Sequence, residues 1–337
     1  MSIIRFFPTQ DAFISKGLQQ NTGRDEILEI GHCEREGVET SARLLIEFSQ
    51  KDILAYTRKL DSFKATMKLY SADRKNIPAK YTLLVYRLAE DWEEGLGRVT
   101  DGGVWTTGVS WTNRTSSSRW KEEGGTLGDL ITSLDFNVDT LETLGDLSID
   151  VTDLVKKGKI GGVLIMVKDE EGFFENRSRL SFFSSNTHTV YRPYLEIEHD
   201  DSVRDSELPV VEGEDYTITS NSLHREYRIG EKPVIRLGVR PRYPVRCFST
   251  ASLYFKESIL PENSQWGIKD DYTADMYVNF GEGTKISADN SGSFFMLDTS
   301  ILTSGRYLDL LIRSEHNGTV KVEKVGSPFK VSNVCQT

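Results

Sequence analysis

Cysteine is scarce in this chain of 337 residues, which contains only Cys33, Cys247 and Cys335. Small secreted scaffolds carry dense, even sets of cysteines, so this odd and sparse set favours free thiols and synthesis in a reducing cytoplasm. The N-terminal sequence lacks the charged start, apolar run and cleavage site of a signal peptide. No stretch reaches the roughly 20 apolar residues of a membrane span, so we expect no membrane partner.

Basic residues are outnumbered by acidic ones, with a formal net charge of -10 at pH 7 and a sequence pI of about 5.2. Proteins that bind nucleic acid present a basic surface to the phosphates, so nucleic acid is an unlikely main partner. An acidic balance by itself indicates solubility and nothing more specific.

Recognisable catalytic motifs are missing as well. The five histidines are scattered, and no His-x-x-x-His, Cys-x-x-Cys or Gly-x-Ser-x-Gly pattern occurs. The acidic run Glu90–Glu94 lies beside aromatic residues, as a glycosidase site would require, but such runs are usually solvated loops. We therefore expect no catalytic residues, no cofactor and no enzymatic activity.

The chain is rich in short segments that alternate polar and apolar residues, the pattern of half-buried strands. Turn residues separate these segments at short intervals, which indicates an antiparallel sandwich or jelly roll. We predict an all-β fold whose first domain, residues 1–200, is a jelly-roll β-sandwich. Its expected strands are 3–7, 26–31, 41–48, 63–70, 81–88, 147–151, 162–168, 180–185 and 192–199.

Three segments of the first domain do not have this pattern. Residues 49–60 form a weak helical candidate, and residues 150–158 are expected to form one short helical turn that ends at Gly158. Residues 127–144 are polar with little periodicity and are expected to form a surface loop.

Residues 201–215 change in character, because Asp, Ser, Glu and Pro dominate and few side chains could enter a core. This composition predicts a linker. Residues 216–337 then contain about eight further short strand patterns, which favour a second, immunoglobulin-like β-sandwich.

Four of the five tryptophans, Trp92, Trp105, Trp111 and Trp120, lie in one glycine-rich segment. Exposed tryptophans in such a cluster would make a platform on which sugar rings stack. Buried tryptophans would instead close one open end of the sandwich, and large aromatic residues are usually core or interface anchors. Burial is the favoured interpretation, and glycan binding stays open.

A structural calcium ion is a further hypothesis for the first domain. Asp11, Asn21, Gly23 and Asp25 lie close together in sequence and offer the hard oxygen ligands that Ca²⁺ prefers. No linear ligand motif accompanies them, and the Asn-Thr-Gly segment is equally typical of a simple turn.

A basic segment in the second domain suggests a protein interface. It contains Arg236, Arg240, Arg242 and Arg246 beside Tyr243, and arginine and tyrosine are favoured interface anchors. We add Trp266 and Tyr272 as further candidate anchors. A nucleic-acid contact or a merely solvated face are the alternatives.

The first domain resembles the DNRLRE-type jelly-roll modules, which are related to carbohydrate-binding modules and occur in extracellular and virion proteins. The resemblance covers residues 3–198. The residues that carry it are Pro8–Ile14, Asn21–Gly23, Leu28–Gly31, Arg43–Phe48, Glu90–Gly95, Gly108–Arg114, Trp120 and Asp150–Val155.

The second domain resembles the C-terminal β-domain of structural proteins from large contractile-tailed bacteriophages, through Tyr227–Pro244 and Leu260–Tyr272. The two resemblances together imply a structural virion component of the neck, tail or baseplate, assembled in the host cytoplasm. Its implied partners are other virion proteins and symmetric copies of itself. The alternative function is a glycan-binding module that recognises a host surface.

Overall fold

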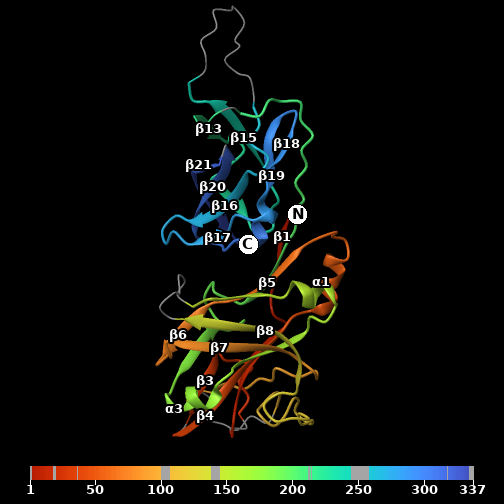
Figure 1. Ribbon diagram of the computed structural model, residues 1–337, viewed down its shortest axis with the longest axis vertical. Helices are drawn as coiled ribbons and strands as arrows, with labels where there is room; N and C mark the ends of the chain where they lie inside the picture. Colours follow the sequence, from red (N-terminus) through yellow and green to blue (C-terminus); the bar gives the residue numbers. More distant parts are fainter. Residues whose placement is uncertain are drawn as a thin grey trace, which may run out of the picture. The chain divides into compact units, whose positions relative to one another are not determined.

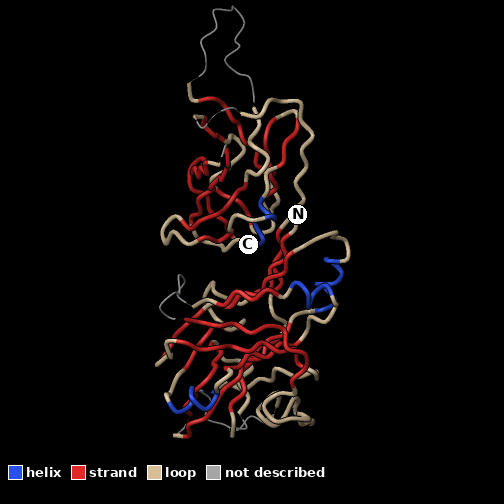
Figure 2. Tube along the Cα trace, in the orientation of Figure 1, coloured by secondary structure: helices blue, strands red, loops and turns tan. Residues whose placement is uncertain are grey.

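The computed structural model describes residues 2–17, 20–35, 37–99, 107–137, 145–211, 213, 215–243, 258–316 and 318–333. They form two compact units: an N-terminal unit, Arg5–Ile197, and a C-terminal unit that joins Met1–Ile4 to Glu198–Thr337. Strands, red in Figure 2, dominate both units, so the all-β class is confirmed. None of the helices in the described part of the chain has the length and hydrophobicity that a membrane crossing requires.

The N-terminal unit contains two sheets (Figure 1). The four-stranded sheet has the order β1 (Ile3–Phe6), β12 (Tyr194–Glu198), β5 (Lys64–Leu69) and β9 (Leu147–Asp150). The eight-stranded sheet has the order β6 (Ser71–Lys75), β11 (Arg179–Phe183), β3 (Ile27–Arg35), β4 (Val38–Glu47), β10 (Gly162–Val167), β7 (Lys80–Leu88) and β8 (Leu127–Asn137), with β2 (Gln10–Ser15) also paired to β4.

Strand β10 shows why a continuous apolar run predicts a central strand. It lies antiparallel between β4 and β7, and its residues Val163, Leu164 and Ile165 are fully buried. A strand that is covered on both faces and paired on both edges has no position where a polar side chain would reach water.

The expected surface loop over residues 127–144 is wrong in its first part, because Leu127–Asn137 form β8. The pairing of β8 with β7 contains two irregularities, on either side of Tyr86. Such bulges shift the alternation of side chains between the two faces, so the sequence has no uniform period of two. Residues 138–144 lie outside the described part.

The predicted helices are present and short. Helix α1 (Gln50–Thr57) begins after Ser49, whose side chain accepts a hydrogen bond from the backbone of Asp52. Helix α2 (Thr152–Lys156) is followed by Gly158 in the left-handed region, at a φ of 65°. A third helix, α3 (Glu170–Glu175), was not expected and is capped by Asp169.

The C-terminal unit also contains two sheets. One has the order β13 (Tyr216–Thr219), β15 (Val234–Pro241), β19 (Gly292–Met296) and β18 (Ser287–Asp289). The other has the order β14 (Glu226–Arg228), β21 (Thr319–Ser332), β20 (Tyr307–His316), β16 (Gln265–Asp270) and β17 (Met276–Val278). Two short 3-10 helices, Glu282–Thr284 and Thr299–Ile301, connect strands.

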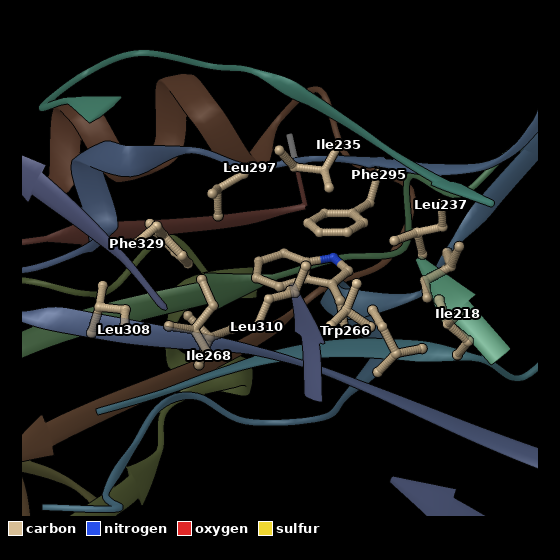
Figure 3. Close-up of a cluster of buried hydrophobic side chains, with 14 of the residues drawn as sticks. Ile218, Ile235, Leu237, Trp266, Ile268, Phe295, Leu297, Leu308, Leu310 and Phe329 are labelled. Atoms are coloured by element: carbon tan, nitrogen blue, oxygen red, sulfur yellow. The ribbon is translucent and has the colours of Figure 1, made fainter. Parts of the chain in front are cut away.

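Trp266 lies at the centre of the apolar core of the C-terminal unit (Figure 3). It is 2% exposed, and its indole stacks on the ring of Phe295 with centroids 4.9 Å apart. Its expected role as an exposed interface anchor is therefore wrong. The isolated position of Trp266 in the sequence did not distinguish a core residue from a surface anchor.

The expected linker at residues 201–215 is instead bound to the C-terminal unit. The amide of Asp205 donates to the carbonyl of Ala288, and the amide of Ala288 donates to the carbonyl of Val203, both at 2.9 Å. Further along, Val211 is 2% exposed and belongs to the apolar core. The segment is polar because many of its side chains face solvent, while its backbone forms hydrogen bonds with the C-terminal unit.

The N-terminal residues complete this same unit. Ile3 is 4% exposed and belongs to the apolar core of the C-terminal unit. The carbonyl of Ser2 accepts a hydrogen bond of 2.8 Å from the amide of His199. A Cβ atom on Gly283 would lie 2.9 Å from the Ile3 side chain, so glycine permits this close approach.

We therefore predict that Ile3→Ala destabilises the C-terminal unit, although the residue is at the other end of the sequence. Loss of a buried isoleucine costs about 2–5 kcal/mol. Calorimetric unfolding should show one transition moving to lower temperature. Phe7→Ala, at a side chain that is 51% exposed, is the control and should change stability by about 0.5 kcal/mol or less. An unchanged calorimetric profile for Ile3→Ala would contradict the assignment.

Candidate functional site

The tryptophan-rich segment packs into the N-terminal unit. Trp92, Trp111 and Trp120 are 5%, 7% and 5% exposed and share one apolar cluster with Leu45 and other residues of the sheet. These three rings offer no open face, so the predicted glycan platform is wrong for them and the interpretation as buried anchors is correct. Trp105 lies outside the described residues.

Arg43 of β4 holds this segment against the sheet. Its guanidinium lies 4.8 Å from the centre of the Trp111 ring and donates a 2.9 Å hydrogen bond to the carbonyl of Gly124. Two further hydrogen bonds of 2.8 Å join it to the carboxylate of Glu170. The cation–π contact and the bidentate ion pair together fix the position of the Trp111 ring.

Asn21 fixes the segment from the other side. Its side-chain amide donates to the carbonyls of Glu94 and Val109 at 2.6 and 2.8 Å, and its Oδ1 accepts from the amide of Gly97 at 2.8 Å. Asn21 is 1% exposed, so these bonds satisfy loop groups that water does not reach.

Glycine is required where two stretches of loop backbone in this segment come into contact. Gly95 and Gly108 both have positive φ angles, of 81° and 91°. A Cβ atom on Gly108 would lie 2.4 Å from the Cα atom of Gly95, a distance that no side chain tolerates. The glycine-rich composition therefore serves backbone packing around Asn21.

The structure gives other contacts to the four predicted calcium ligands, of which Asp11 accepts a 2.6 Å hydrogen bond from the amide of Ser185. Asn21 uses its amide as described, Gly23 accepts a 3.0 Å hydrogen bond from Asn186, and both Asp25 carboxylate oxygens accept from the amide of Val99 at 3.3 Å. No group of three or more metal-binding side chains occurs among the described residues. The Asn-Thr-Gly segment is a turn tied into the loop network.

The acidic run also has a structural role. Glu90 accepts a 3.0 Å hydrogen bond from the amide of Lys121, Glu93 accepts one of 3.2 Å from Ser116, and Glu94 accepts one of 3.1 Å from Asp11. Each of these carboxylates binds a backbone amide of another segment, so the run helps to hold the loop.

The predicted interface residues of the C-terminal unit do not form one surface. Arg236 is paired within the unit: its guanidinium makes hydrogen bonds of 2.9 and 2.8 Å with Asp289 and lies 5.0 Å from the ring of Phe294. Arg240 lies on the same exposed face of β15, as the strand pattern predicted. Arg246 lies outside the described residues.

Tyr272 lies at the opposite end of the unit from Arg242. Tyr272 follows β16, whose last residue pairs with Leu308 near the start of β20. Arg242 shares a cavity with Ser314 and His316 near the end of β20. Because a strand rises about 3.3 Å per residue, roughly 20 Å separates the two positions along β20. Tyr272 and Arg242 therefore cannot both anchor one small interface.

The strongest remaining candidate is the end of the C-terminal unit that carries Arg240, Arg242 and Tyr243, which we call the basic end. Tyr243 is 76% exposed, and both arginines are exposed and form no ion pair with another described residue. Strand β13 positions them, because Tyr216 pairs with Pro241 and the amide of Arg242 donates to the carbonyl of Asp215 at 2.8 Å.

A cavity of about 290 Å³ adjoins these residues, lined by Arg242, Tyr216, His316 and Lys321 among others. The Lys321 ammonium lies 4.2 Å from the centre of the Tyr216 ring and donates a 2.9 Å hydrogen bond to the carbonyl of the same residue. Asp215 is the carboxylate in the lining. Lys321 also forms an ion pair of 2.9 Å with Glu323, so the cation in this lining that is open to an acidic partner surface is Arg242. Sequence reasoning missed Lys321 because it lies on a distant strand.

Comparisons with known proteins add little. No protein-family model and no curated protein matches the chain. A solved structure of a DUF4785 family protein from Legionella pneumophila is similar over 98% of this chain, with 11% identity and a TM-score of 0.18. The chain spans 62% of the length of that protein. A likeness at this TM-score carries no argument about fold or function.

The Asn21 network generates a first test at this site. Asn21→Asp replaces the donating NH₂ group by an oxygen that faces the carbonyls of Glu94 and Val109. A buried carboxylate with one oxygen against two carbonyl oxygens is strongly unfavourable, and we expect a loss of about 3–5 kcal/mol in the free energy of unfolding. Urea unfolding monitored by tryptophan fluorescence measures it.

Asn290→Asp is the matched control, because Asn290 is exposed and its Oδ1 accepts a 2.9 Å hydrogen bond from Glu207 that aspartate can also accept. Its effect should be about 0.5 kcal/mol or less. Equal effects of the two substitutions would show that Asn21 does not hold the loop.

Asp11 gives the site a pH dependence. Its carboxylate is 1% exposed, one oxygen accepts a 2.6 Å hydrogen bond from the amide of Ser185, and the other oxygen has no partner. The pKa of Asp11 is raised to about 7, mainly by burial and to a smaller extent by the nearby Glu94 carboxylate, while Ser185 and Arg192 act in the opposite direction.

Because the pKa of Asp11 is higher in the folded state than its ordinary value of 3.8, the folded protein binds this proton more tightly. The stabilisation that this proton contributes is fully present below about pH 4. It is lost as the pH rises through about 7, which lowers the free energy of unfolding by at most roughly 4 kcal/mol. Asp11→Asn should reduce this decrease, measured by urea unfolding at pH 5 and pH 8. Asp129→Asn, at an exposed carboxylate, should leave it unchanged. An undiminished decrease in Asp11→Asn would refute the assignment.

Proposed function

We propose that this chain is a structural component of a tailed-bacteriophage particle, in the neck, tail or baseplate, and that it acts through protein–protein assembly. The observation that carries the proposal is the basic end, where Arg240, Arg242 and Tyr243 are exposed in a chain of net charge -10. Exposed arginines beside an aromatic side chain are typical anchors of protein interfaces.

The sequence resemblances of both domains to virion proteins support the same function. An all-β chain whose Glu90 and Glu93 carboxylates bind backbone amides of the tryptophan-rich segment is also consistent with a structural protein. Cys33 is buried and is not part of a disulfide, which agrees with assembly in a host cytoplasm, while Cys247 and Cys335 lie outside the described residues. We propose no glycan-binding function, because three of the four tryptophans that the glycan alternative would use are buried.

The partner surface of the basic end is proposed to be acidic. Arg240 and Arg242 have no carboxylate partner among the described residues, so their charge is available to a neighbouring subunit. A specific interface buries on the order of 1,200 Å² or more, and a like charge placed within it costs several kcal/mol.

We therefore expect the double variant Arg240→Glu/Arg242→Glu to fold normally but to fail to enter particles. Exposed substitutions change stability by only about 0.5 kcal/mol, so thermal unfolding should match the wild type. Complementation of a phage that lacks the native chain, followed by quantification of the chain in purified particles, measures incorporation.

Arg225→Glu/Arg228→Glu is the control, because these two exposed arginines adjoin β14, which pairs with the far end of β21. That variant should enter particles at the wild-type level. Wild-type incorporation of Arg240→Glu/Arg242→Glu would mean that the basic end is only a solvated face.

A further inference from the structure

Strand β8 is an unusually long strand at the edge of a sheet. It has eleven residues and, within the described part of the chain, pairs only with β7. The next longest strand with a single partner among the described residues is β2, with six residues. The other edges of the described sheets end in strands of three to five residues.

Proteins usually protect such edges, since a free row of backbone donors and acceptors is a template for another strand. The common protections are short length, lysine residues, proline or a covering segment. The β8 sequence contains no lysine, arginine or proline, and its charged residues are Asp129 and Asp135. Leu130 is 52% exposed. Bulges disturb only its first part, and the stretch from Thr132 to Phe136 is regular.

The inner face of this regular stretch is apolar. Thr132, Leu134 and Phe136 lie opposite Val85, Leu83 and Tyr81 of β7, which are buried. The ring of Phe136 stacks on that of Tyr81 with centroids 4.9 Å apart. Ser133 and Asp135 are exposed on the outer face. A strand added at this edge would extend both the apolar inner face and the polar outer face of the sheet.

A cavity of about 620 Å³ lies beside the edge. Asp129 to Thr132 of β8 line one side, and Phe63 and Leu154 line the other. The lining opposite β8 also includes Thr152, Lys157 and Lys159, so side chains of an added strand next to Thr132 would meet a mixed apolar and polar surface.

We propose that the β8 edge pairs antiparallel with the β8 edge of a second copy of this chain, about a two-fold axis through Leu134. On the inner face, Leu134 then lies opposite Leu134 of the copy, and Thr132 lies opposite Phe136, whose ring faces the cavity. On the outer face, Ser133 lies opposite Asp135, which accepts a hydrogen bond from its hydroxyl. Both copies supply the same surface, as a two-fold interface requires.

Charge and strand regularity select this register. An axis through Thr132 would place Asp135 opposite Asp129, and like charges directly opposite each other are destabilising. An axis through Ser133 would place Asp135 opposite Ile131, at the bulge in the β7 pairing. The axis through Leu134 uses only the regular stretch and opposes no like charges.

The first test uses two charges at one exposed position. Ser133→Asp places a carboxylate opposite Asp135 twice in each dimer, and Ser133→Lys places an ammonium there instead. We expect the wild-type chain to sediment as a dimer, Ser133→Asp to dissociate roughly tenfold more readily, and Ser133→Lys to dimerise at least as well as the wild type. Sedimentation velocity over a range of protein concentrations measures all three.

The second test measures the register. Facing Cβ atoms in an antiparallel pair lie within about 5.5 Å, whereas disulfides require Cα atoms within about 7 Å. A mixture of Ser133→Cys and Asp135→Cys chains should therefore form a cross-linked dimer under oxidising conditions. Ser133→Cys alone should not, since its two copies are offset by two residues along the strand pair, a diagonal of roughly 7–8 Å. The wild-type chain, with its own three cysteines, gives the background.

A wild-type chain that is monomeric at every concentration would overturn the proposal, as would equal dissociation of the aspartate and lysine variants. Cross-linking by Ser133→Cys alone would overturn the register. These residues belong to the N-terminal unit and the basic end to the C-terminal unit, so self-association and particle incorporation are separate readouts.

Discussion

The burial of three indole rings beneath a glycine-rich loop is the constraint on which the N-terminal unit depends. A loop that covers an apolar cluster must satisfy its own polar groups without water. Asn21 does so from one side and Arg43 from the other, while glycines let the backbones touch at Gly95 and Gly108. The tryptophans are consequently held as anchors, and the acidic residues of the loop bind backbone amides.

Two of the expected interface anchors of the C-terminal unit, Trp266 and Arg236, make their contacts within the unit. Trp266 stacks in the core and Arg236 binds Asp289. Arg240 and Arg242 stay exposed beside the end of β20, where β13 holds them in place. This division between engaged and exposed residues supports a building block that works through surface contacts.

The sequence predicted the fold class and many strands because local alternation encodes them, and the continuous run of β10 indicated a central strand. It missed β8, whose bulges break the period of two, and it missed the pairing of residues 201–215, which depends on Ala288 and Ile259 far along the chain. The sequence predicted the candidate site residues less well than the fold. Asn21, Trp266 and Tyr272 took their roles from partners or positions that no local pattern contains.

A reconstruction of the intact phage particle tests the central claim most directly. The account predicts density for this chain at a symmetric position, with Arg240 and Arg242 of the basic end against carboxylates of a neighbouring protein. Purified particles that lack the chain, or that hold it with the basic end facing solvent, would contradict the account.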